Sequence, residues 1–338
     1  DSRQLQNVAS VDATTVAALG AAGVGGGGTV DLTADGSISS GDVVGISGNG
    51  TVSKTSAVLG PTTSFASADR GQVCSYWDQA ANKVVVAGHN GGTYLLIKVG
   101  TIASNGAISW GSDYTFYTSS QPFGINVAMH NNVIVATFAA SSWGTYRMGW
   151  SFGVSGTSIV SNSGIQYVEG SFGYSNYGQT NSQRLMADPN NSGKFVEANT
   201  GTGNVFPYAT LISATGSSMS STNYQITSAY GQTSKNCIAY NPSSGDFMGV
   251  WTNTSNAVIA ARLTVSGSSL SIGSYYYQDL PQSNDNYGLA YSSATGNFLW
   301  ITRDGGKLYG WSLFTDASGN PTGFGGTNLI VNASGSDW

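Results

Sequence analysis

An internal repeat of about 50 residues constrains the fold of this 338-residue chain more than any other feature of its sequence. The two clearest copies span residues 237–274 and 288–325, and aligning them places Gly245 on Gly296. A glycine in a Ser/Thr-rich turn marks the same point of each copy: Gly106, Gly156, Gly216, Gly267 and Gly319. The spacings of 50, 60, 51 and 52 residues between these glycines predict five copies between about residue 73 and the C-terminus.

Each copy has the pattern of four short strands joined by tight turns. In the copy at 237–274 the four apolar runs are Ile238–Tyr240, Phe247–Trp251, Val258–Val265 and Leu270–Ile272. A glycine or asparagine in the first turn supplies the positive φ that a tight hairpin needs. Four strands in 40–50 residues are typical of a blade of a β-propeller, in which neighbouring blades bury each other's faces. We therefore predict an all-β fold, a five-bladed β-propeller over residues 65–338 with a narrow central channel; a β-solenoid and a string of sandwiches are the alternatives.

The composition supports an all-β fold and limits the partners. The chain has 47 glycines, 11% aromatic residues and only 9% charged residues, which excludes collagen, coiled-coil and disordered classes. With a net charge of −5, we expect no broad attraction to nucleic acid, and no apolar run is long enough to span a membrane as a helix. A neutral surface rich in hydroxyl and amide groups is compatible with carbohydrate partners.

The first 64 residues lie outside the repeat. We expect an N-terminal arm with a glycine-rich linker over residues 1–28 and a small β module over residues 29–64, with hairpin turns at Asp35–Gly36 and Asn49–Gly50. Because some thirty residues cannot bury a core alone, this module is predicted to attach or oligomerise. Its candidate anchor residues are Val16, Leu19, Val43, Val44 and Ile46. The alternative is a disordered end followed by a β extension of the first blade.

The repeat resembles the blades of virion fibre and receptor-binding proteins of tailed bacteriophages. The matching residues are Ala239–Phe247, Ala290–Phe298 and Gly153–Ile159, and Ser39–Ser53 resembles a short β module of phage tail and capsid-decoration proteins. This resemblance covers about 290 of the 338 residues through its pattern rather than through invariant residues. It implies an extracellular protein on the virion surface, a propeller head, a homo-oligomeric attachment domain (possibly a trimer) and binding to a host-surface glycan or receptor.

The sequence shows no motif of a known catalytic site. It has two histidines, His89 and His130, and His130 is interpreted as a solvated turn residue. Glu169 and Glu197 could supply the two carboxylates of a glycosidase, but nothing marks them as a pair. The stretch from Thr302 to Tyr309 resembles an Asp-box, which is a structural turn, and Cys74 and Cys237 are predicted to be free thiols. We therefore predict no enzyme activity, no metal and no cofactor.

A glycan site is expected on one rim of the propeller, in the loops between the second and third strands. The candidate residues, which offer amides, one stacking face and an ion pair, are His89, Asn90, Trp143, Asn199, Asn253, Arg303 and Asp304. The sequence thus favours a non-enzymatic virion surface protein that binds a host glycan. A purely structural decoration or filament subunit and a secreted propeller lectin are the alternatives.

Overall fold

The structure is a computed structural model, and it describes residues 33–35, 44–46, 51–54, 73–89, 94–103, 107–117, 122–140, 147–169, 183–200, 206–228, 233–253, 257–280, 285–304 and 307–332. The chain divides into two compact units. The first holds residues 1–62 and 104–107, and the second holds residues 63–103 and 108–338. The expected division at residue 28 and the candidate anchors Val16, Leu19 and Val43 lie outside the described residues.

The first unit contains a small three-stranded sheet. Strands β2 (Val44–Ile46) and β3 (Thr51–Lys54) form the antiparallel hairpin predicted around Asn49–Gly50, and the candidate anchors Val44 and Ile46 lie in β2. The second predicted hairpin is wrong, because β1 (Thr33–Asp35) pairs with β3 in parallel rather than turning back through Gly36 onto its neighbour. A parallel pair needs an intervening connection, and here β2 lies within it.

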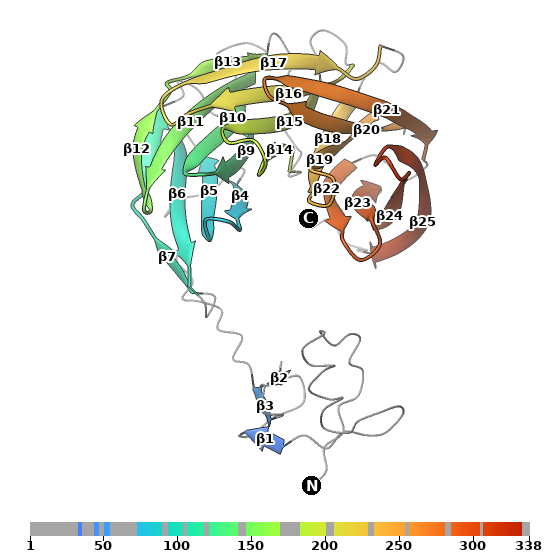
Figure 1. The fold of residues 1–338 in the computed structure, drawn as a ribbon, viewed down its shortest axis with the longest axis horizontal. Coiled ribbons are helices and arrows are strands. Elements are labelled where there is room, and N and C mark those ends of the chain that lie inside the picture. Colours follow the sequence, from blue (N-terminus) through green and yellow to red (C-terminus); the bar gives the residue numbers. More distant parts are fainter. Residues whose placement is uncertain are drawn as a thin grey trace. The chain divides into compact units, whose positions relative to one another are not determined.

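The second unit consists of five antiparallel sheets, numbered 1 to 5 in chain order (Figure 1). Sheet 1 contains β4 (Val73–Asp78), β5 (Lys83–His89), β6 (Tyr94–Ile102), β7 (Ile108–Trp110) and β8 (Tyr114–Tyr117). Sheet 2 contains β9 (Pro122–His130), β10 (Val133–Ala140), β11 (Arg147–Ser155), β12 (Ser158–Asn162) and β13 (Gln166–Glu169). Sheet 3 contains β14 (Leu185–Ala187), β15 (Lys194–Thr200), β16 (Pro207–Ala214) and β17 (Met219–Gln225). Sheet 4 contains β18 (Thr233–Asn241), β19 (Asp246–Asn253), β20 (Ala257–Ser266) and β21 (Ser269–Asp279). Sheet 5 contains β22 (Asp285–Ser292), β23 (Asn297–Asp304), β24 (Lys307–Thr315) and β25 (Pro321–Asn332).

The first turn of each sheet has the backbone that the sequence predicted. Gly193, Gly245 and Gly296 have φ values of 72°, 76° and 71°, and Asn82 takes the same place in sheet 1 with a φ of 51°. Sheet 2 has the shorter turn that the sequence indicated, and the pair Asn131–Asn132 closes it with two positive φ values. Local turn chemistry therefore sets the register of the first two strands in all five sheets.

Each pair of successive sheets shares one hydrophobic cluster. Alternate residues of the second strand point to opposite faces of the sheet, one toward the preceding sheet and the next toward the following one. The residues of the second strands that share a cluster are Val85 and Ile134 between sheets 1 and 2, Val135 and Phe195 between sheets 2 and 3, Val196 and Phe247 between sheets 3 and 4, and Met248 and Phe298 between sheets 4 and 5. Both faces of the three middle sheets are therefore buried.

The five sheets follow one another along an arc, with the first strand of each sheet on its inner side (Figure 1). This radial packing of four-stranded antiparallel sheets is the architecture of a β-propeller. The predicted fold class is confirmed. The count of five blades in a closed ring with a narrow channel stays a prediction, since sheets 1 and 5 lie at the two ends of the arc.

Candidate functional site

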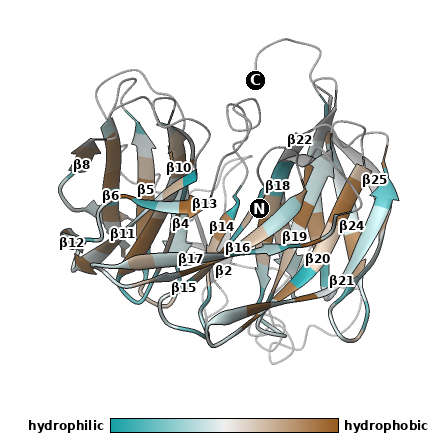
Figure 2. Cartoon of the chain, turned by 90° about the horizontal axis from the view of Figure 1, so that it is seen from above, coloured by the Kyte–Doolittle hydropathy of each residue, from teal (hydrophilic) through white to brown (hydrophobic). Residues whose placement is uncertain are grey.

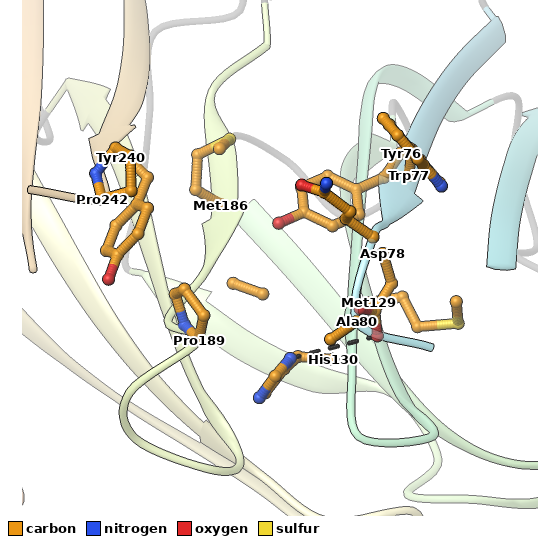
Figure 3. A pocket seen from close by; sticks show the side chains of 12 residues that line it. Tyr76, Trp77, Asp78, Ala80, Met129, His130, Met186, Pro189, Tyr240 and Pro242 are labelled. Atoms are coloured by element: carbon orange, nitrogen blue, oxygen red, sulfur yellow. Dashed lines mark ion pairs between the residues drawn. The ribbon is translucent and has the colours of Figure 1, made fainter. Parts of the chain in front are cut away.

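A pocket of about 510 Å³ opens on the inner side of the arc, at the end of the sheets that carries the first turns (Figure 3). Sheets 1 to 4 all contribute to it, through the ends of their first strands and the turns that follow. The described lining residues are Tyr76, Trp77, Asp78, Gln79, Ala80, Met129, His130, Met186, Ala187, Pro189, Tyr240 and Pro242. Its volume is in the range of sites that bind small molecules.

Asp78 is the last residue of β4, and one of its carboxylate oxygens caps the first turn of sheet 1. Its Oδ1 accepts the backbone N–H of Ala81 at 3.2 Å. The corresponding side chains of sheets 3 and 4 cap their first turns in the same way. Asp188 accepts the backbone N–H of Asn190, and Asn241 accepts the backbone N–H of Ser243. In Asp188 the second oxygen is also used, because Oδ2 accepts the side-chain amide of Asn191 at 2.9 Å. In Asp78 the second oxygen is buried and accepts no hydrogen bond from the described residues.

His130 is the neighbour that Asp78 faces. It is the last residue of β9, 7% exposed, and its Nδ1 lies 4.0 Å from Asp78 Oδ2 (Figure 3). That separation exceeds a hydrogen bond but is one that a water molecule can bridge. The interpretation of His130 as a solvated turn residue is wrong, because His130 is the last residue of β9 and is a buried residue that lines the pocket.

Tyr76 and Tyr240 stand on opposite walls of the pocket (Figure 3). Burial raises the pKa of the Tyr76 phenol to about 12, although a hydrogen bond with the backbone of Ala187 acts to lower it. The Tyr76 hydroxyl therefore keeps its proton at neutral pH and can donate it in a hydrogen bond. The Tyr240 hydroxyl accepts a hydrogen bond from the side-chain amide of Asn190 at 2.9 Å, and burial raises its pKa as well.

The rest of the wall is apolar. Met129, Met186, Pro189 and Pro242 cover the space between the polar groups. Among the described lining residues none is a lysine or an arginine, and the one carboxylate is Asp78. The pocket therefore suits a small molecule with both apolar and hydroxyl surface, and it disfavours an anionic group.

The residues predicted for a glycan site on the loops between second and third strands do not line this pocket. His89 and Asn199 are both buried, at 4% and 2% exposure, and burial lowers the pKa of His89. The Asn199 side-chain amide donates to the hydroxyl of Thr210 inside sheet 3. For Asn253, Arg303 and Asp304 the structure gives the strand position alone, in β19 and β23. Asn90 and Trp143 lie outside the described residues.

Of the two glutamates considered for a glycosidase pair, Glu197 has a structural role, and for Glu169 the structure gives the strand position alone, in β13. Glu197 is fully buried between sheets 2 and 3, where its Oε1 accepts hydrogen bonds from Arg147 Nε at 3.0 Å and from the Thr137 hydroxyl at 2.9 Å. Both cysteines are free thiols, as predicted, with Cys237 buried and Cys74 partly buried. Within the described ranges no group of three metal-ligating side chains occurs, and no helix is long and apolar enough to cross a membrane.

The fold is that of an all-β propeller with a pocket on the inner side of its sheets, and comparison with known proteins supports the fold. No protein-family model matches the sequence, and no curated protein sequence does. Among solved structures, a candidate 6-phosphogluconolactonase from Bacteroides fragilis is similar, with a TM-score of 0.53 and 12% identity over 76% of this chain and 70% of that one. A second, from Bacteroides uniformis, has a TM-score of 0.52 and 8% identity over 74% of this chain and 70% of that one.

These similarities correct one prediction made from the sequence. The sequence predicts no enzyme activity because it shows no catalytic motif, and this prediction is wrong, because the same fold occurs in proteins described as lactonases that share almost no sequence with this chain. Function depends on the geometry and chemistry of a site rather than on the fold, so a missing motif along the chain does not exclude catalysis. The comparisons offer no support for a role on a virion.

Proposed function

We propose that the protein is a hydrolase that opens unphosphorylated sugar lactones, or closely related cyclic esters, in the central pocket. The observation that carries this proposal is the buried Oδ2 of Asp78, which accepts no hydrogen bond within the described part of the chain and lies 4.0 Å from Nδ1 of His130. A buried carboxylate beside a histidine in a cavity is the arrangement of a general base with its orienting partner. The lactonase descriptions of two proteins with this fold favour the same chemistry.

In this mechanism His130 acts as the general base. Its imidazole takes a proton from a water molecule, and the oxygen of that water attacks the lactone carbonyl carbon to give a tetrahedral oxyanion. The Asp78 carboxylate stabilises the imidazolium that forms. Collapse of the intermediate breaks the bond between the carbonyl carbon and the ring oxygen, and the imidazolium returns its proton to that oxygen. The product is the open hydroxy acid.

The remaining wall residues supply binding and charge stabilisation. The Tyr76 hydroxyl stays protonated, because burial raises its pKa to about 12, and it can donate a hydrogen bond to the developing oxyanion. Gln79 and Tyr240 offer hydrogen-bonding groups to sugar hydroxyls, and the methionines and prolines cover the apolar face of the ring.

The substrate is proposed to be unphosphorylated because the described pocket residues include no cation to hold a phosphate. Phosphate sites are built from Arg, Lys or clustered backbone N–H groups. Here the charged neighbour is the Asp78 carboxylate, which repels an anion. The proposed substrate therefore lacks the phosphate group of the substrate named for the two structural neighbours.

The test is a pH-stat assay of lactone opening with the full chain, corrected for the spontaneous rate. Glucono-δ-lactone and its 6-phosphate are compared at equal concentration. We expect enzyme-dependent opening of the unphosphorylated lactone and little or none of the phosphorylated one. Absence of catalysis with both, and with a panel of other lactones, would contradict the proposal. The position on a virion, the host glycan and the homo-oligomer stay predictions that rest on the sequence resemblance.

A further inference from the structure

Side-chain hydrogen bonds join neighbouring sheets at the end of the sheets that carries the first turns. The sheets themselves pack through hydrophobic strands, among them β6 and β24 (Figure 2). The bonds at the turns link Lys83 to Asn132 at 2.6 Å, Asn131 to Ser192 at 3.3 Å, Asn190 to Tyr240 at 2.9 Å and Tyr291 to Ser243 at 3.1 Å. Among these side chains, Tyr240 alone is a described lining residue of the pocket.

The hydroxyl of Tyr240 differs from that of Tyr291 in the direction of its hydrogen bond. In Tyr291, which takes the same place in sheet 5, the hydroxyl donates to the hydroxyl of Ser243. The side-chain nitrogen of Asn190 can only donate, so the oxygen of Tyr240 accepts, and no described residue accepts the phenol proton in turn. Burial raises the pKa of Tyr240, so this proton stays in place at neutral pH and is available to a ligand in the pocket.

The surroundings of Asn190 and Tyr240 hold the bond in this direction. Asn190 is exposed, but the fully buried Asp188 accepts its backbone N–H at 2.8 Å and so fixes its turn. Gly245 leaves room for the amide, because a Cβ there would lie 2.6 Å from Asn190 Nδ2. The ring of Tyr240 packs against that of Phe247, with 5.2 Å between the ring centroids. Asn190 therefore sets where the phenol proton points.

We propose that Tyr240 donates a hydrogen bond to a hydroxyl oxygen of the sugar ring of the substrate, and that Asn190 is the positioning residue that keeps Tyr240 a donor. The inference takes its substrate class from the proposed function. Tyr240 stands across the pocket from Tyr76, so the two phenols serve opposite sides of the ring (Figure 3). The pair then favours hydroxylated lactones over unsubstituted ones, because a ring without hydroxyls leaves the Tyr240 proton without an acceptor.

Three variants distinguish a donor role from a purely structural one. Tyr240→Phe removes the hydroxyl. Asn190→Asp keeps the hydrogen bond but reverses it, because a carboxylate accepts the phenol proton, and Asn190→Ala removes the bond and leaves the phenol free to turn. Tyr291→Phe is the matched control, since it removes the equivalent hydroxyl of sheet 5, which is not among the described lining residues. The melting temperature of each variant checks its folding.

The first measurement is the binding of neutral monosaccharides, D-glucose first, to the full chain by NMR titration. These sugars have the hydroxylated ring but no ester bond. We expect Tyr240→Phe and Asn190→Asp to weaken binding by roughly threefold to tenfold, Asn190→Ala to weaken it less, and Tyr291→Phe to leave it unchanged. A structural bond would give the opposite order, with Asn190→Asp harmless and Asn190→Ala costly. That order, or a wild-type chain that binds none of the sugars, would overturn the proposal.

The second measurement separates this proposal from the proposed function. Glucono-δ-lactone is compared with δ-valerolactone, which has the same ester ring without hydroxyls, in the pH-stat assay. Tyr240→Phe should raise KM for glucono-δ-lactone by roughly threefold to tenfold with little change in kcat, and it should affect δ-valerolactone much less.

Two results divide the proposals. A wild-type chain that binds sugars with the expected order of variants but opens neither lactone would contradict the proposed function and support the roles of Tyr240 and Asn190. A wild-type chain that opens both lactones, with Tyr240→Phe slowing both equally, would support the function and overturn the assignment of a hydroxyl oxygen as the acceptor.

Discussion

Arg147 of β11 and Glu197 of β15 form a fully buried ion pair that joins sheets 2 and 3. The Arg147 guanidinium also donates to the carbonyl of Gly124 at 2.8 Å and to the Thr137 hydroxyl at 2.7 Å, so its charge is held by several acceptors. A buried pair of this kind gives little net stability, but removing one partner leaves a charge in a medium that solvates it poorly.

Glu197→Leu should therefore lower the free energy of unfolding by about 3–5 kcal/mol. Arg147→Met should cost a similar amount, and the double variant should lose clearly less than the sum, because no uncompensated charge is left. Urea unfolding of the three variants and the wild type measures this. Additive losses would show that the two residues act independently and would refute the coupling.

Two turn glycines separate backbone strain from steric clash: Gly193 in the first turn of sheet 3, and Gly267 in the turn between the third and fourth strands of sheet 4. A Cβ at Gly193 would lie 2.5 Å from the carbonyl oxygen of Ala214, whereas a Cβ at Gly267 would meet nothing within 4 Å. Both residues have a positive φ, so Gly267→Ala should cost about 1–2 kcal/mol through conformation alone. Gly193→Ala should cost more, because the Ala214 carbonyl must shift. Equal losses in thermal unfolding would mean that the chain relaxes around the clash.

Two buried acidic groups, the Cys237 thiol and the Tyr76 phenol, should make the folded protein less stable at alkaline pH. Burial raises the pKa of Cys237 well above its ordinary value of 9.0, and it raises the pKa of Tyr76 from 10.0 to about 12. Each group keeps its proton longer in the folded state than in the unfolded chain. Its contribution to stability is therefore complete below the unfolded pKa and is lost as the pH rises, from about 9 for the thiol and between 10 and about 12 for the phenol.

The free energy of unfolding should accordingly fall by up to about 1.4 kcal/mol per pH unit for each group within its window. Urea unfolding at about pH 8 and pH 10.5 measures the slope. Cys237→Ala should reduce the slope, whatever it does to the stability at pH 8, and Tyr76→Phe should reduce it at the upper end. A wild-type protein equally stable at both pH values would contradict this prediction.

Most of the strand positions could be predicted from the sequence because they depend on local patterns. Alternating apolar runs such as Val258–Val265 lie in β20, and the turn glycines Gly245 and Gly296 have the positive φ that a tight hairpin requires. Repetition strengthened each of these signals, since five copies show the same turn at the same spacing. The parallel pairing of β1 with β3 was missed because adjacent turn signals favour a hairpin.

The pocket could not be predicted from such patterns, because Tyr76, His130, Met186 and Tyr240 come from four different sheets. Their proximity depends on the radial packing of the blades, which no window of the sequence contains. One signal was nevertheless present: aligned by their first turns, Asp78 and His130 are both the last residue of a first strand, in successive copies. Equivalent positions in adjacent blades lie side by side, so this alignment alone would have brought the two together.

The most direct test of the account compares the wild-type chain with Asp78→Asn in the opening of glucono-δ-lactone. The amide can still accept the hydrogen bond from Ala81 through its oxygen, so the turn and the fold should persist, as a melting temperature will show. We predict that the variant loses about 10²–10⁴-fold in kcat with a smaller change in KM, because the carboxylate acts on the imidazolium in the transition state. A folded Asp78→Asn variant with wild-type kcat, or a wild-type chain that does not accelerate the reaction, would contradict the assignment of this pocket as the active site.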